Sequence, residues 1–129
     1  MAEPVYIEKA VAAALKASAD VAAICAGRIY PSKIPQGTKL PAVVYQRTYS
    51  SPDYTLCGYG SEAVVLMINS FALTFDEAKK LALAVRSTMA PAPLNSILRN
   101  EVDLYEEGAG AHCISAEYLV QQYGGYCYG

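Results

Sequence analysis

Apolar residues recur at helical spacing near the start of the chain. Four of them share one face of a helix: Ile7, Val11, Ala14 and Leu15. This pattern predicts a helix over Val5 to Ser18. A second, shorter helix is expected over Asp20 to Ala26, with Gly27 closing it in a left-handed conformation.

Strand-like patterns follow a proline-rich segment. Ala42 to Thr48 is β-branched and aromatic and predicts a strand, and Tyr49 to Gly60 is rich in Ser, Pro, Asp and Gly and predicts a long loop. Ser61 to Ala72 is apolar at both odd and even positions. A strand of that kind is expected in the middle of a sheet, covered on both faces.

The clearest helix follows Leu73. Thr74 and Glu77 have the spacing of a capping box, and Pro91 and Pro93 mark the helix end. The apolar residues expected to face the core are Phe75, Ala78, Ala82, Val85 and Met89. The helix is therefore predicted over Thr74 to Ala90, with its polar side in solvent.

Two more strands are expected, over Ser96 to Glu106 and His112 to Tyr123. The order is α-(α)-β-β-α-β-β, and the short connections predict two antiparallel hairpins. The fold class is α+β, with a roughly four-stranded, mainly antiparallel sheet and two main helices packed on one face. We expect a single domain over residues 1–122, followed by a Gly/Tyr-rich tail over residues 123–129.

The composition narrows the possible functions. The chain has 129 residues, of which 53% are hydrophobic, and a formal net charge of -2. This balance argues against disorder and against a general nucleic-acid binder, which would carry a basic surplus. The N-terminus has neither a secretory nor a transit pattern, and no apolar run approaches the roughly 20 residues of a membrane span. The sequence predicts a soluble protein made in the cytoplasm.

Candidate catalytic and metal-binding groups are few. His112 and Cys113 are adjacent, but neighbours on a strand point to opposite faces and cannot pair. The four cysteines, Cys25, Cys57, Cys113 and Cys127, contain no CxxC pair and are expected to be reduced. We therefore expect no catalytic residue, no metal and no cofactor. The alternative from another functional class is a small cytosolic enzyme or ligand-binding domain that uses Cys113 or the acidic strand.

Tyrosine is unusually common, with 11 residues against two phenylalanines and no tryptophan. Tyrosine on a background of small residues provides contact area at low entropic cost, and it is enriched in interface cores. The interface candidates lie in or beside the predicted loop and in the tail: Arg47, Tyr49, Asp53, Tyr54, Tyr59, Tyr123, Tyr126 and Tyr128. The sequence thus indicates a binding protein more than an enzyme.

One segment resembles a known family. The stretch over Gly27 to Tyr45 reads GRIYPSKIPQGTKLPAVVY, and it is followed by the apolar strand and by FDEAKKLALAVRSTM. Together these features resemble the tail-completion protein family of long-tailed bacteriophages, which includes tail-terminator and tail-to-head joining proteins. The resemblance covers most of Val21 to Met89.

The resemblance implies an architectural subunit of the virion, assembled in the host cytoplasm. It implies a ring, typically a hexamer, that ends the tail tube and meets the tail-tube protein on one side and the head connector or stopper protein on the other. DNA would pass through the lumen without specific binding, and no membrane would be involved. The candidates for a repelling lumen wall are Glu101, Asp103, Glu106 and Glu107. A stopper or minor tail protein is the alternative within the same class.

The proline-rich segment has two interpretations. An extended segment with several prolines has little entropy left to lose and can be laid along a neighbour. Pro31 to Pro41 is therefore either a stiff strap against the sheet edge or an adjacent subunit, or a crossover that covers the bottom of the core.

Overall fold

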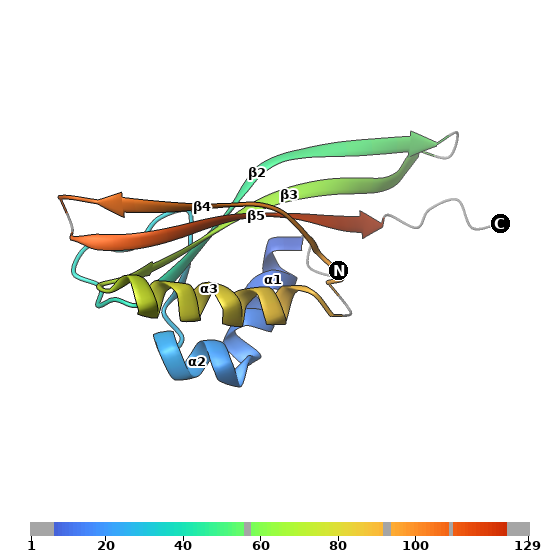
Figure 1. Cartoon of the computed structure of the whole chain (residues 1–129). Helices are drawn as coiled ribbons and strands as arrows, with labels where there is room; N and C mark the ends of the chain where they lie inside the picture. The colour runs from blue at the N-terminus through green and yellow to red at the C-terminus, as the bar shows by residue number, and fades with distance from the viewer. Residues whose placement is uncertain (1–6, 56–57, 92–93, 109, 124–129) are drawn as a thin grey trace.

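The computed structural model describes residues 7–55, 58–91, 94–108 and 110–123, of which 51–55, 58–62 and 122–123 are described by their backbone alone. The elements are α1 (Ile7–Ala17), α2 (Ala19–Cys25), β1 (Ile29–Pro31), β2 (Ala42–Thr55), β3 (Gly58–Ala72), α3 (Phe75–Met89), β4 (Ile97–Glu106) and β5 (Ala111–Tyr123). Their arrangement is shown in Figure 1.

The strands form one five-stranded sheet in the order β1-β2-β3-β5-β4. The pairs β2–β3, β3–β5 and β4–β5 are antiparallel, which confirms the predicted hairpins and the α+β class. The short strand β1 was not predicted; it pairs in parallel with β2, Ile29 lying opposite Val43. Three residues that end at Pro31 are too few to give an alternating pattern, so the sequence does not reveal them.

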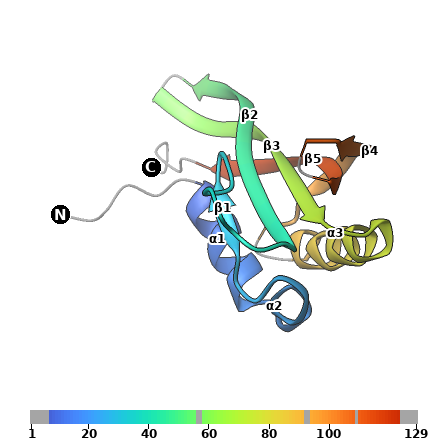
Figure 2. The same ribbon diagram turned by 90° about the vertical axis from the view of Figure 1, so that its left-hand side faces the viewer.

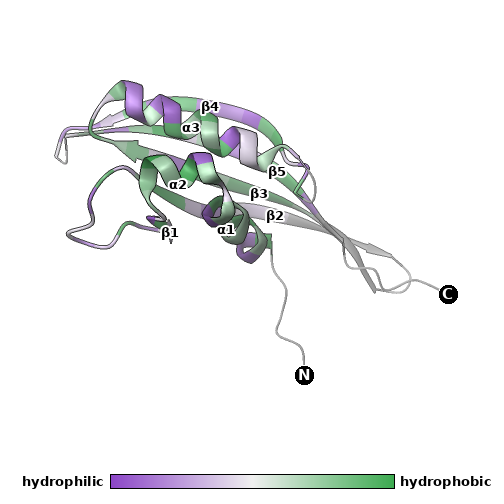
Figure 3. Ribbon diagram, turned by 90° about the horizontal axis from the view of Figure 1, so that it is seen from below, coloured by the Kyte–Doolittle hydropathy of each residue, from purple (hydrophilic) through white to green (hydrophobic). Residues whose placement is uncertain are grey.

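The three helices all pack on one face of the sheet, which we call the covered face (Figures 1 and 3). The core between them contains Val11 and Leu15 of α1, Leu81, Val85 and Met89 of α3, and Val64, Leu66, Ile68, Tyr118 and Val120 of the sheet. None of the helices described lies on the opposite face, which we call the open face. β3 is central, as predicted, but the expectation that both its faces are covered is wrong, because helices cover only one. On the open face Met67 and Phe71 are half-buried.

The helices α2 and α3 begin and end close to the residues that the sequence predicts. Ser18 caps α2 by accepting a hydrogen bond from Val21 N at 3.4 Å, and Thr74 caps α3 by accepting one from Glu77 N at 3.2 Å. Gly27 has the predicted left-handed conformation, with φ 80°. The residue before it, Ala26, is the C-cap of α2 and is also left-handed, with φ 52°. Phe75 was wrongly placed in the core. It is the first residue of α3, and its ring is 48% exposed.

The prediction of a long loop over Tyr49 to Gly60 is also wrong. Both strands continue through it: Tyr49 pairs with Val65 and Tyr54 with Tyr59, with register shifts at Arg47/Tyr49 and Asp53/Tyr54. The Ser, Pro and Gly residues hide the strand pattern, and backbone pairing between two long partners outweighs their low strand propensity. We call residues 49–55 and 58–64 the hairpin arm; it extends past the helices in Figure 1.

Candidate assembly interface

The open face carries a row of apolar side chains at the base of the hairpin arm. The strand registers place Tyr49, Val65, Leu119 and Ile97 directly beside one another on β2, β3, β5 and β4. Tyr49 and Ile97, at the two ends of the row, are 51% and 60% exposed. Large apolar side chains gathered on one face in this way mark an interaction surface more often than an ordinary solvated one.

Arg99 spans this row from the β4 side. A register shift between Leu98 and Asn100 leaves Arg99 outside the regular pairing. Its Nη1 donates a hydrogen bond to the Tyr49 hydroxyl at 3.1 Å, and its Nε lies 3.8 Å from the Glu117 carboxylate. No sequence pattern points to Arg99, because the strand irregularity that places it outside the regular pairing is not periodic. Tyr49 is thus held in place while its ring stays half exposed.

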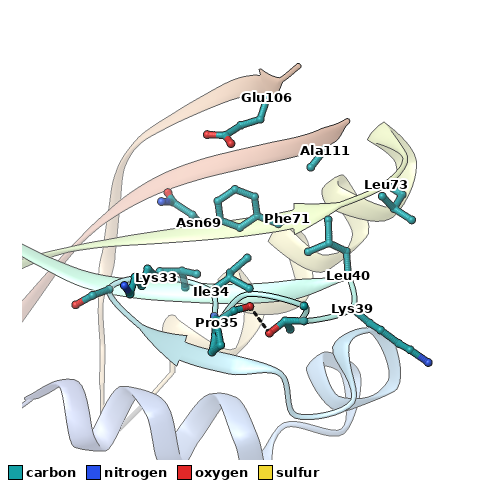
Figure 4. A pocket seen from close by; sticks show the side chains of 14 residues that line it. Lys33, Ile34, Pro35, Lys39, Leu40, Asn69, Phe71, Leu73, Glu106 and Ala111 are labelled. Atoms are coloured by element: carbon teal, nitrogen blue, oxygen red, sulfur yellow. Dashed lines mark hydrogen bonds between the residues drawn. The ribbon is translucent and has the colours of Figure 1, made fainter. Parts of the chain in front are cut away.

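A hollow of about 820 Å³ lies at the other end of the open face. Its floor includes Val44, Asn69 and Phe71 of β2 and β3. One wall is the segment over residues 32–40, which we call the strap, and Glu106 of β4 lies on the far side (Figure 4). The lining of the hollow is mainly apolar, and it includes three charged residues, Lys33, Lys39 and Glu106.

The strap makes up most of the proline-rich segment between Pro31 and Pro41. It leaves β1 through a hydrogen bond from Ser32 N to Tyr45 O at 2.9 Å, and the Arg28 Nε donates to Pro41 O at 2.9 Å where it returns. Between these points Ile34 and Leu40 line the hollow. The strap therefore joins the parallel strands β1 and β2 and lies over part of the open face.

The side chain of Arg47, an interface candidate, forms an ion pair with Glu8 of the same chain. Its Nη2 and Nε donate to the two oxygens of the Glu8 carboxylate at 2.7 and 2.9 Å. Both side chains are partly buried, at 27% and 24% exposure. This two-point contact fixes α1 to β2, a structural role that Arg47 and Glu8, 39 residues apart, do not reveal in the sequence.

The remaining interface candidates lie near the hairpin arm or outside the described residues. Asp53, Tyr54 and Tyr59 belong to the arm, and Tyr123 ends β5 opposite Ser61 of β3. Their backbones are thus brought to one end of the sheet. Tyr126 and Tyr128 lie outside the described residues.

The four acidic lumen candidates fall into two pairs. Glu101 and Asp103 point to the covered face and contact α3: Glu101 binds the Arg86 guanidinium at 2.8 Å, and Asp103 binds the Lys79 ammonium at 2.8 Å. Glu106 and Glu107, at the β4–β5 turn, are exposed. Only this second pair carries charge that no cation in the described part of the chain balances.

His112 and Cys113 do not form a catalytic pair. The His112 ring lies between Phe75 and Tyr105, with centroids 5.9 and 4.8 Å away, whereas Cys113 is buried under the open face. Burial, with a smaller effect of the Glu106 charge, raises the pKa of the Cys113 thiol to about 11, so the thiol is protonated at neutral pH. Cys25 and Cys113 are both free.

Among residues 7–55, 58–91, 94–108 and 110–123 no group of His, Cys, Asp and Glu could hold a metal ion. No helix in the same ranges is long and apolar enough to cross a membrane.

Comparisons with known proteins agree with this picture. A chain from a solved structure described as "Virion of native gene transfer agent (GTA) particle" has the same fold, with a TM-score of 0.73 at 19% identity over 88% of this chain and 92% of that chain. No curated protein matches the sequence. The model of the family described as "Tail completion protein gp17" matches residues 9–118. The chain therefore belongs to this tail completion family and is a structural protein of the phage-type tail.

Proposed function

We propose that this chain forms a ring, six copies in all, at the head-proximal end of a phage tail tube. The ring ends growth of the tube and joins the tail to the head connector or its stopper protein, and DNA passes through the lumen. The protein assembles in the host cytoplasm, and its role is architectural and needs no reaction or cofactor. The observation that carries the proposal, beside the family, is the open face with the hairpin arm at its end.

The open face supplies the contact area that a ring subunit needs. Tyr49, Ile97 and Leu104 are each at least half exposed on it. Burial of such side chains against a neighbour stabilises association by roughly 25 cal/mol per Å² of apolar surface before the costs of binding are subtracted. An isolated subunit leaves this surface in water.

The hairpin arm supplies a second kind of contact. β1 pairs with β2 only over residues 43–45, so among the described residues no strand lies beside the outer edge of β2 along the arm. Unpaired backbone N–H and C=O groups along an edge accept a strand from another chain. We propose that the arm, with Asp53, Tyr54 and Tyr59, contacts the last ring of tail-tube protein, and that the tyrosines of the tail, Tyr123, Tyr126 and Tyr128, add to this contact.

The lumen wall is proposed to be the acidic strand β4 and the turn after it. A channel through which DNA slides must not hold its phosphates, and carboxylates do not bind them. Glu101 and Asp103 are balanced by α3, so Glu106 and Glu107 carry the unbalanced charge. If all four are changed to lysine and DNA leaves the particle at the same rate, this assignment is wrong.

The proposed function is tested with a tagged copy of the chain expressed in cells that produce its natural particle. Negative-stain microscopy of the material it retrieves should show tail tubes with a ring at one end. A homogeneous small particle with no tube or capsid partner would contradict the proposal. An untagged copy, carried through the same purification, is the control.

A further inference from the structure

The hollow on the open face carries three charges that no ion pair in the described part of the chain balances. Lys33 and Lys39 line it from the strap, and Glu106 lines it from β4. All three side chains are exposed. Figure 4 shows the Lys39 ammonium turned outwards, so that its charge lies at the mouth of the hollow. With two lysines against one glutamate, the hollow is positive overall, and the strap is its positive side.

Between these charges the lining is apolar. The apolar residues come from the strap, from β2 and from β3 and its end: Ile34, Leu40, Val44, Phe71 and Leu73. Leu73 is 60% exposed. Aliphatic or aromatic side chains of a partner gain free energy by leaving water for such a surface, whereas a sugar–phosphate backbone does not. At about 820 Å³ the hollow is in the size range of pockets that enclose a ligand-sized group.

The strap side of the hollow is held in shape within the chain. Thr38 donates twice to the Pro35 carbonyl oxygen, from its N at 3.2 Å and from its Oγ1 at 2.6 Å. Gly37 supplies the left-handed backbone between them, with φ 84°. Little of this wall has to be ordered when a partner binds, which lowers the entropic cost of binding. A partner therefore meets a hollow that is already formed.

The hollow and the hairpin arm lie towards opposite ends of the same sheet. Val44, on the floor of the hollow, and Tyr54, in the arm, both belong to β2 and are ten residues apart. At about 3.3 Å per residue this is roughly 30 Å of strand. In Figure 1 the arm extends past the helices at one end of the sheet, and α3 begins, two residues after Leu73, at the other. If the arm meets the tail tube, the hollow faces away from the tube.

We propose that the hollow binds an acidic, apolar segment of the head-side partner, which is the connector or its stopper protein. Apolar side chains of the segment lie on the floor at Phe71, and a carboxylate lies beside Lys33 of the strap. The acidic end is on the strap side because Glu106 repels a carboxylate on the β4 side. The inference rests on the proposed function and assigns the site and the chemistry of its head-side contact.

Two variants change the hollow in different ways. Lys33→Glu/Lys39→Glu reverses the charge of the strap, and Leu73→Asp puts a carboxylate into the apolar lining. The matched controls lie outside the hollow: Lys16→Glu changes an exposed lysine of α1, and Leu83→Asp changes a leucine of α3 that is 55% exposed. Because all five side chains are exposed, every variant is expected to fold, and thermal unfolding verifies it.

The assay adds purified full-length chain to tails produced without it and then mixes these tails with heads that carry the connector and stopper protein. Negative stain gives two counts, the capped tube ends and the tails joined to heads. We expect both hollow variants to cap within about twofold of the wild type but to join at least about tenfold fewer heads, because a repelled carboxylate replaces a favourable contact. Both controls should cap and join normally.

The two counts separate this inference from the proposed function. If the hollow variants join heads as well as the wild type does, the head-side site is elsewhere and the proposed function stands. If they also fail to cap tubes, the hollow lies in a contact with the tube or between copies, and the inference is wrong.

A loss of joining in only one variant contradicts the combined chemistry. Loss with Lys33→Glu/Lys39→Glu alone indicates that the lysines bind phosphates of DNA, and loss with Leu73→Asp alone indicates a segment without an acidic end. If the wild type itself neither caps tubes nor joins them to heads, the proposed function falls and the inference falls with it.

Discussion

Arg99 and Tyr49, fifty residues apart in the chain, are joined by a hydrogen bond of 3.1 Å across the open face of the sheet. They come from β4 and β2, and the row between them is completed by Val65 and Leu119. Val65 is 1% exposed although no helix covers this face. The contact therefore orders the surface that we propose as an assembly interface before any partner arrives.

Tyr49→Ala is expected to weaken assembly more than folding. The ring is half exposed, so its loss should change the free energy of unfolding by less than about 1 kcal/mol. As an interface residue it should contribute at least about 1 kcal/mol to association, and capped tubes should become several-fold rarer. Tyr49→Phe, which removes only the hydroxyl, is the matched variant. Equal capping by wild type and Tyr49→Ala would remove Tyr49 from the interface.

Arg47→Met is expected to destabilise the fold, because Arg47 holds α1 to β2 through both oxygens of Glu8. Loss of hydrogen bonds to a partly buried charge should lower the free energy of unfolding by about 1.5–3 kcal/mol in urea denaturation. Lys16→Met, on the exposed side of the same helix, should change it by less than about 0.5 kcal/mol. A cycle with Glu8→Gln isolates the pair, and additive effects would show that the contact is not stabilising.

Tyr118 provides a test of the core. Its side chain is 1% exposed, and its hydroxyl is buried beside the Arg86 guanidinium without a hydrogen bond of ordinary length and angle in the described part of the chain. Tyr118→Phe should therefore leave the free energy of unfolding unchanged within about 1 kcal/mol, or raise it. Tyr118→Ala should lower it by about 3–5 kcal/mol, because it leaves a cavity. A large loss in the phenylalanine variant would mean that the hydroxyl is bonded after all.

The same side chain predicts sensitivity to alkali. Burial raises the pKa of Tyr118 to about 12 and that of Cys113 to about 11, so the folded state disfavours both anions. The unfolded chain deprotonates at the ordinary values of about 10 and 8.5–9. The stabilisation is thus complete below pH 8.5 and is lost as the pH rises towards 12. Thermal melts from pH 7 to 12 should show this loss, reduced in Tyr118→Phe/Cys113→Ser.

Cys113 should also resist alkylation. A buried thiol with a pKa near 11 is almost fully protonated at pH 7.5, and the thiolate is the reactive form. Mass spectrometry after iodoacetamide treatment should find Cys113 unmodified in the native protein and modified in urea. Rapid native modification at Cys113 would revive the alternative of a thiol-dependent enzyme.

The helices and the central strands could be predicted from the sequence because their patterns are local. The spacing of Val11 and Leu15, and that of Ala78, Ala82 and Val85, fixes which face of each helix is buried. The caps at Ser18 and Thr74 depend on a few adjacent residues. These features need no knowledge of the rest of the chain.

What the sequence did not reveal depends on contacts between distant residues. β1 forms because Ile29 pairs with Val43 of β2, and the hairpin arm begins where Tyr49 pairs with Val65 of β3. The position of Arg99 follows from a strand irregularity that leaves no periodic pattern. Phe75 has the spacing of a core residue, but it is the first residue of α3 and lies near one end of the sheet. There its ring meets the His112 ring in an edge-to-face contact. Each of these outcomes required the sheet to be assembled first.

The most direct test of the proposed function is microscopy of tails that carry a gold-labelled copy of this chain. Gold should mark one end of each tube, the end that joins the head, and averaged end views should show six-fold symmetry. Tails made without the chain should have tubes of irregular length that do not attach to heads. Label distributed along the tube, or found at the opposite end, would contradict the account.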